Sequence, residues 1–107
     1  ALLVFSVIII FHELGHFLAF IAGNVDQSSA FASVYNSEKA KFTGYNKAYA
    51  TQNAAEYFAE SVKDYMLNGA ALSSQRPNTY KAIQSALNTV TTARADVILK
   101  AYSSIWS

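Results

Sequence analysis

The sequence contains no cysteine, only one proline and only four glycines in 107 residues. Without cysteine, disulfides and thiolate metal ligands are excluded, and no redox compartment is indicated. Because proline and glycine interrupt regular structure, their scarcity favours a mainly α-helical chain with few tight turns. Charged residues make up only 14% of the chain, the formal net charge is +1, and no segment carries a basic stripe. We therefore expect no nucleic-acid partner.

The chain has only two histidines, and both lie in a pattern that runs from His12 through Glu13 to His16 inside a long apolar run. Positions i and i+4 share one helix face, so both imidazoles can point at one ion, as two ligands of tetrahedral zinc do. Glu13 directly follows the first histidine, and its carboxylate can act as general base toward an activated water. The pattern therefore indicates a hydrolytic zinc site rather than a structural one. A chance match with two packed core histidines is the alternative.

Residues 1–22 are nearly long enough to span a bilayer, and their first part, residues 1–11, is apolar all round, which fits either a buried helix or a membrane helix. Glu13 would lie within such a span at a cost of about 2.5–3.5 kcal/mol, which argues against a simple anchor. A basic leader and a small-residue cleavage site are both lacking, so the segment is not an intact signal peptide. The chain begins without methionine or a polar lead-in. We expect it to be a piece of a longer protein.

Three further helical regions are predicted. Gly23-Asn24 suits a helix stop, and a second helix is expected over about residues 28–42, with Glu38 on its outer, solvated side. Residues 43–52 have no helical period and are expected to form a loop. A third helix is expected over about residues 53–68, ending at Asn68-Gly69.

Closing helices are expected over about residues 77–106, because Pro77 suits a first helical position. One apolar stripe continues along this region and includes Tyr80, Ile83, Leu87, Val90, Val97, Ile98, Ala101, Tyr102 and Ile105. Whether the helix is continuous through Thr91-Thr92 is left open. The whole chain is expected to form a single domain.

A third protein ligand for zinc has to be a carboxylate, since no further histidine and no cysteine are present. Glu56 and Glu60 are four residues apart on one face of the third helix, among small residues that permit close helix packing. One carboxylate can bind the ion while the other orients a ligand imidazole. The alternatives are a capping box from Asn53 to Glu56 and an exposed surface charge at Glu60.

Three stretches carry a family resemblance: residues 12–16, residues 49–60 and residues 74–83. Tyr49 precedes Glu56 by seven residues, and the sequence then continues with two aromatic residues, alanine and Glu60. In these features the chain resembles the anthrax lethal factor catalytic-domain family, a group of zinc metallopeptidases that also includes Pro-Pro endopeptidases. The resemblance covers most of residues 11–90.

The resemblance implies a gluzincin that cleaves a protein or peptide substrate with one Zn²⁺ ion. His12, His16 and Glu56 would bind zinc, and Glu13 would be the general base. Tyr49 would donate a hydrogen bond to the oxyanion, with Glu60 as support behind the ligands. The fold would be the helical part of a zincin-like metalloprotease domain, without the upstream substrate-binding sheet. The resemblance also implies a secreted or cell-surface, toxin-like bacterial protein.

Two other classes of protein remain open. Residues 7–18 also look like the first catalytic membrane helix of site-2 intramembrane metalloproteases, although no Asp-Gly signature or second long apolar run follows. The chain would otherwise be a non-catalytic helical interaction domain whose motif has lost its metal. Membrane contact by residues 1–22, oligomeric state and substrate specificity are left open.

Overall fold

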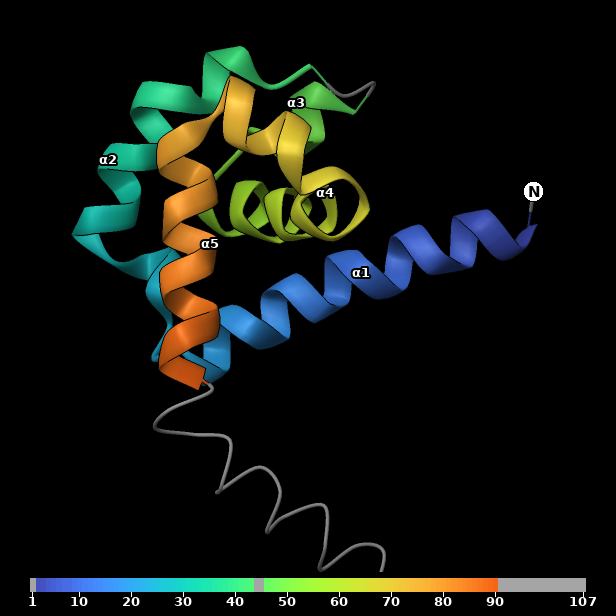
Figure 1. The fold of residues 1–107 in the computed structure, drawn as a ribbon, viewed down its shortest axis with the longest axis horizontal. Helices are drawn as coiled ribbons and strands as arrows, with labels where there is room; N and C mark the ends of the chain where they lie inside the picture. The colour runs from blue at the N-terminus through green and yellow to red at the C-terminus, as the bar shows by residue number, and fades with distance from the viewer. Residues whose placement is uncertain (1, 44–45, 91–107) are drawn as a thin grey trace, which may run out of the picture.

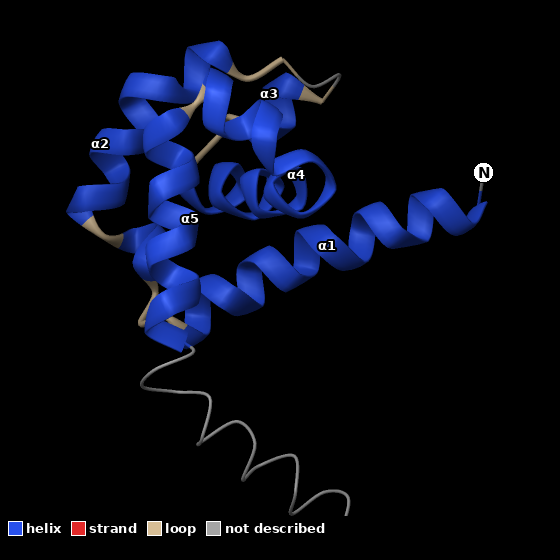
Figure 2. Ribbon diagram, viewed as in Figure 1, coloured by secondary structure: helices blue, strands red, loops and turns tan. Residues whose placement is uncertain are grey.

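The computed structural model describes residues 2–43 and 46–90, and these residues form helices joined by short connections (Figures 1 and 2). No β-strand occurs within these two ranges, so the prediction of a mainly helical fold is confirmed. In chain order the elements are α1 (Leu2–Ile21), η1 (Val25–Gln27), α2 (Ser29–Glu38), η2 (Lys39–Lys41), α3 (Lys47–Ala50), α4 (Ala54–Gln75) and α5 (Pro77–Thr89).

The ends of the helices follow local sequence signals. After α1, Gly23 has φ of 88° and Asn24 has φ of 59°, a left-handed conformation that glycine and asparagine tolerate best. The expected helix stop at these residues is confirmed. Ser28 caps α2, because its hydroxyl accepts a hydrogen bond of 3.1 Å from the amide of Phe31. Pro77 begins α5, as its position in the sequence predicts.

Two expectations about the middle of the chain need correction. Residues 43–52 are not entirely a loop, because α3 occupies Lys47–Ala50. The third helix does break at Asn68, where φ is −158° and ψ is 74°, but helical structure resumes and continues to Gln75. The Asn68 side chain accepts a hydrogen bond of 3.2 Å from the amide of Ala71, so it caps the second part of α4. The closing-helix residues after Val90, including Thr91-Thr92 and the later part of the predicted stripe, lie outside the described residues.

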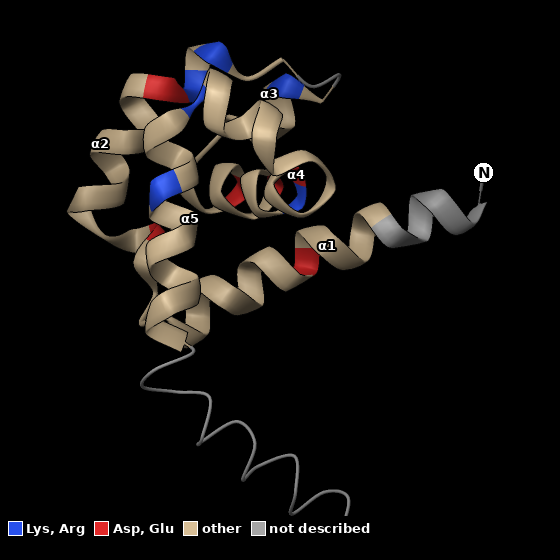
Figure 3. Cartoon of the chain, in the orientation of Figure 1, with Lys and Arg blue, Asp and Glu red and all other residues tan. Residues whose placement is uncertain are grey.

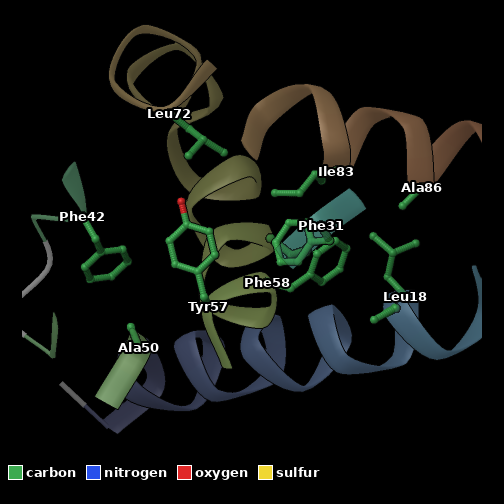
Figure 4. Packing of buried hydrophobic residues seen from close by; sticks show 11 residues of the cluster. Leu18, Phe31, Phe42, Ala50, Tyr57, Phe58, Leu72, Ile83 and Ala86 are labelled. Atoms are coloured by element: carbon green, nitrogen blue, oxygen red, sulfur yellow. The ribbon is translucent and has the colours of Figure 1, made fainter. Parts of the chain in front are cut away.

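Helix α4 lies at the centre of the fold and contacts α1, α2, α3 and α5 (Figure 1). The first turns of α4 supply the fully buried Tyr57 and Phe58. Phe58 packs edge-on against Phe31 of α2, with ring centroids 5.1 Å apart, and Ile83 of α5 lies beside them (Figure 4). Burial of large apolar side chains of this kind stabilises the fold by roughly 1.5–3 kcal/mol each. The core therefore fixes the start of α4 relative to its neighbours.

Helix α1 buries only one side against α4 and extends away from the other helices at its N-terminal end (Figure 1). Leu18 and Ala19 are buried, whereas the outward side exposes the large apolar residues Ile9, Ile10, Leu14, Phe17 and Phe20. Glu13 is the single charged residue of α1, and Figure 3 shows it as the one acidic segment of this helix. Within the part of the chain that the structure describes, no helix combines the length and apolar character required to cross a bilayer.

The expectation that Glu38 lies in solvent is wrong, since its side chain is only 2% exposed. Its carboxylate accepts hydrogen bonds from the backbone amides of Asn78, at 3.0 Å, and Thr79, at 2.7 Å. The Thr79 hydroxyl donates a further hydrogen bond of 2.6 Å to Glu38. The first amides of a helix lack partners within the helix and attract negative charge. Glu38 therefore joins the end of α2 to the beginning of α5.

Candidate metal centre

Helices α1 and α4 bring three potential metal ligands together. His12 and His16 lie one helical turn apart on α1, and their ring centroids are 4.9 Å apart. Glu56 lies in the first turn of α4. One ligand atom from each residue lies within 4.8 Å of the other two. Zinc holds nitrogen and oxygen ligands at about 2.0–2.2 Å, so atoms that share one ion lie within about 4 Å of each other. The group fits one zinc ion after small side-chain adjustments.

The Glu56 carboxylate faces both imidazoles. Its Oε2 atom lies 2.9 Å from Nε2 of His12, and its Oε1 atom lies 3.4 Å from Nε2 of His16. The amide of Glu56 donates a hydrogen bond of 2.8 Å to the side chain of Asn53, which caps α4. Of the two hydrogen bonds of a capping box, the one from the Glu56 amide to Asn53 is present. The Glu56 side chain does not complete the box, because it points to the histidines. Both Nε2 atoms share one carboxylate, an arrangement that suits a common cation.

His12 lies between two carboxylates. Its Nδ1 atom is 3.0 Å from Oε1 of Glu60, on the opposite side of the ring from the nitrogen that faces Glu56. An ionised carboxylate only accepts hydrogen bonds, and each ring nitrogen of His12 faces one, so the nitrogen that donates depends on the tautomer. With the proton on Nδ1, toward Glu60, the lone pair of Nε2 would be available to a metal. Metal-ligating histidines commonly have a carboxylate behind them in this way.

Glu60 is not the exposed surface charge that was the alternative, because it is only 2% exposed. Burial by itself raises the pKa of Glu60, but hydrogen bonds from Asn46, His12 and Lys63 outweigh it, and the pKa is lowered overall. Asn46 Nδ2 donates at 2.6 Å and Lys63 Nζ at 3.1 Å, both to Oε2. Glu60 is therefore ionised and fully engaged, which separates its role from that of Glu56.

Tyr49 lies on α3 beside this group. Its side chain is 52% exposed, and its ring centroid is 6.0 Å from that of His12. A hydrogen bond to Glu56, together with the negative charge of that residue, raises the pKa of Tyr49. The phenol is therefore protonated at neutral pH and can act as a hydrogen-bond donor.

Glu13 has an exposed side chain on α1, directly after His12 in the sequence. Its negative charge contributes to the raised pKa of Tyr49, after the larger effects of Glu56. Of the six residues named from the sequence, five have contacts that link them to one another: His12, His16, Tyr49, Glu56 and Glu60.

Asn46 and Lys63 were missed by sequence reasoning, although both donate to Glu60. Lys63 follows Glu60 by three residues on the same helix, and this ion-pair spacing was a signal that could have indicated it. Asn46 is separated from Glu60 by 14 residues and a turn, and no periodic signal links them.

A helical domain with a His-His-Glu group between two helices defines a class of candidate metalloproteins. Residues 5–86 match the family model described as anthrax toxin lethal factor, N- and C-terminal domain. The chain belongs to this lethal factor family, and the resemblance drawn from its sequence is confirmed at that level. No match was found among curated proteins or among solved structures.

Proposed function

We propose that the chain is part of a zinc-dependent metalloendopeptidase that hydrolyses peptide bonds. The observation that carries this proposal is His12 held between two carboxylates, with Nε2 toward Glu56 and Nδ1 toward Glu60. A purely structural imidazole needs one partner for its N–H group, whereas this ring has a carboxylate at each nitrogen, and the Glu56 carboxylate also lies 3.4 Å from His16.

The proposed ligands are His12, His16 and Glu56, each through one side-chain atom. Bound zinc in such a set supplies Lewis acidity, polarising a scissile carbonyl and activating water. Glu60 holds the His12 ring in the tautomer that leaves Nε2 free to bind.

Glu13 and Tyr49 complete the proposed chemistry. Glu13 accepts the proton of the attacking water and later delivers it to the leaving amine, as a solvent-accessible carboxylate beside the ligands can do. Tyr49 donates its phenolic proton in a hydrogen bond to the oxyanion that forms on the substrate. Its exposed side chain and raised pKa support this role, because the donor reaches the open side and keeps its proton.

The proposal extends to substrate and setting. The family description names a toxin, which supports a secreted or cell-surface bacterial protein that acts on a protein or peptide substrate. The described helices would be the helical part of a single zincin-like catalytic domain, with substrate selection depending on a sheet that these residues do not contain.

The test combines metal analysis with one substitution. The purified protein is expected to bind one zinc ion per chain, and Glu13→Gln is expected to retain the ion. In the full-length enzyme, Glu13→Gln should lower peptide hydrolysis by about 10²–10⁴-fold, the usual contribution of a general base. Hydrolysis at the unsubstituted rate would remove Glu13 from this role. A chain that binds no zinc would instead be a non-catalytic helical domain.

A further inference from the structure

We infer that Asn46 and Lys63 are positioning residues of the metal centre, which act on His12 through Glu60. The inference rests on the proposed function, because it assigns a role toward the same zinc ion. Among the described residues, Asn46 and Lys63 donate hydrogen bonds to Glu60, the carboxylate behind His12, and not to the three proposed ligands. Their effect is therefore on orientation.

The two oxygens of Glu60 have separate partners. Oε1 accepts from Nδ1 of His12 at 3.0 Å, and Oε2 accepts from Asn46 at 2.6 Å and from Lys63 at 3.1 Å. Two donors that converge on one oxygen fix the rotation of the carboxylate about its last bond. The other oxygen then has one position available, in the plane where it meets the imidazole. Ligand imidazoles depend on such partners for ring orientation and tautomer.

The two donors reach Glu60 from different parts of the fold. Lys63 lies one turn after Glu60 on α4, is 9% exposed and also lies 3.6 Å from Asp64. Asn46 precedes α3, the short helix that carries Tyr49. The contact between Asn46 and Glu60 therefore connects α3 to α4 at the site. The same contact therefore connects α3, which carries Tyr49, to Glu60, which orients His12.

The amide of Asn46 has an arrangement that stability alone does not favour. Its nitrogen has to face the ionised Glu60, because an amide oxygen in that place would repel the carboxylate. The oxygen of the same amide is buried and has no hydrogen-bond partner among the described residues. An unpaired buried acceptor is destabilising, and this opposes the gain from the bond to Glu60. The two effects on folding oppose each other, so we expect the contribution of Asn46 to the metal centre to be measurable separately.

Two kinds of variant separate positioning from folding. Asn46→Leu keeps the approximate size, removes the donor and also removes the unpaired oxygen. Lys63→Met keeps the aliphatic stem and removes the ammonium group, while Lys63→Arg keeps a cationic donor. Asn36→Leu on α2 and Lys81→Met on α5 are matched controls, because both side chains are exposed on other helices.

The experiment measures the zinc dissociation constant of each purified variant by competition with a chelator, together with its melting temperature without zinc. Asn46→Leu and Lys63→Met are each expected to weaken zinc binding by about 10-fold, the lower end for residues behind metal ligands. Lys63→Arg should restore most of the affinity, and the two controls should match the unsubstituted chain. Asn46→Leu should melt within a few degrees of it. In the zinc-loaded protein, the Nδ1–H proton of His12 should give a slowly exchanging NMR signal that either substitution broadens.

Each of three results would overturn the inference that Asn46 and Lys63 position the metal centre. Unchanged zinc affinity in Asn46→Leu and Lys63→Met, with tight binding by the unsubstituted chain, overturns this inference and leaves the proposed function intact. Affinity that falls only in step with the melting temperature also overturns it, since the role would then be structural. If the unsubstituted chain binds no zinc, the proposed function fails and this inference fails with it. Should Lys63→Met not fold, Asn46→Leu and Lys63→Arg decide the question.

Discussion

Gly15 of α1 lies directly against the backbone of Ala59 of α4. A β-carbon on Gly15 would be 2.7 Å from both the α-carbon and the carbonyl oxygen of Ala59, closer than such atoms approach in proteins. Gly15 lies between the two histidines in sequence, and Ala59 lies between Glu56 and Glu60. The absence of a side chain on Gly15 therefore lets α1 approach α4 closely enough for the imidazoles to meet the carboxylates.

We expect Gly15→Ala to destabilise the fold and to weaken zinc binding. The added methyl meets backbone, which cannot rotate away, and overpacking of this kind costs about 1–3 kcal/mol, more than the roughly 1 kcal/mol by which alanine favours a helix. Gly69→Ala is the matched control on α4, because its β-carbon would lie an ordinary 3.7 Å from the Tyr80 ring. Urea unfolding of both variants tests this. Equal stability of the two variants would show that the helices separate without penalty.

The second prediction concerns the carboxylate that faces both histidines. Glu56→Ala should weaken zinc binding by more than about 100-fold, beyond the 10–100-fold typical of residues behind the ligands. The helix should survive, because Asn53 still accepts from the backbone amide at position 56. Added zinc at about 100 times its dissociation constant should stabilise the unsubstituted chain by about 2.7 kcal/mol and should not stabilise this variant.

Glu38→Ala is the control for that substitution, and it should behave in the opposite way. Removing this buried acceptor leaves the first amides of α5 without a partner, at a cost of about 1–3 kcal/mol of unfolding free energy. Zinc affinity of the folded protein should not change. Calorimetric titration with zinc, run beside thermal unfolding, separates the two effects. Similar zinc affinities in Glu56→Ala and Glu38→Ala would refute the ligand assignment.

The sequence predicted the parts of the site that share a local period. His12 and His16 have helical spacing on α1, and Glu56 precedes Glu60 by four residues on α4. These pairs are recognisable because one helix places both members on one face. The fold class could be predicted for a similar reason, since scarce proline and glycine leave long helical segments uninterrupted.

What the sequence did not predict depends on contacts between distant segments. Glu38 stands beside lysines in a polar stretch, which is typical of a solvated helix end, yet its partners lie 40 residues further along the chain. Asn46 reaches Glu60 across a turn, and α3 has only four residues, too few to show a helical period. Only the tertiary packing assigns these residues their partners.

A third prediction concerns the phenol of Tyr49. Tyr49→Phe should lower kcat of the full-length enzyme by about 10²–10³-fold, the loss expected for one oxyanion donor. Zinc affinity and stability should be retained, because this side chain is 52% exposed. Tyr65→Phe on α4 is the control and should leave kcat unchanged. Steady-state kinetics on both variants decides whether Tyr49 acts on the substrate, and equal kcat values would exclude it.

The final prediction concerns stability in acid and the carboxylate that joins α2 to α5. Burial by itself raises the pKa of Glu38, but hydrogen bonds from the Thr79 side chain and from the amides of Asn78 and Thr79, with the charge of Lys41, lower it below the ordinary value of 4.5. The unfolded chain therefore binds the proton more readily than the folded one. The stabilisation is full above about pH 4.5 and is lost as the pH falls through the folded-state pKa.

Glu38→Gln removes this titration while keeping the size of the side chain. The variant should be less stable than the unsubstituted protein at neutral pH, by about 1.5–3 kcal/mol for hydrogen bonds to a charged acceptor, and the difference should shrink below pH 4.5. Other carboxylates titrate in both proteins, so their contributions cancel in the comparison. Glu13→Gln, at an exposed position, is the matched control for the loss of one negative charge. Thermal unfolding from pH 7 to pH 3 measures all three, and parallel curves for Glu38→Gln and the unsubstituted protein would show that Glu38 does not hold α5 through its charge.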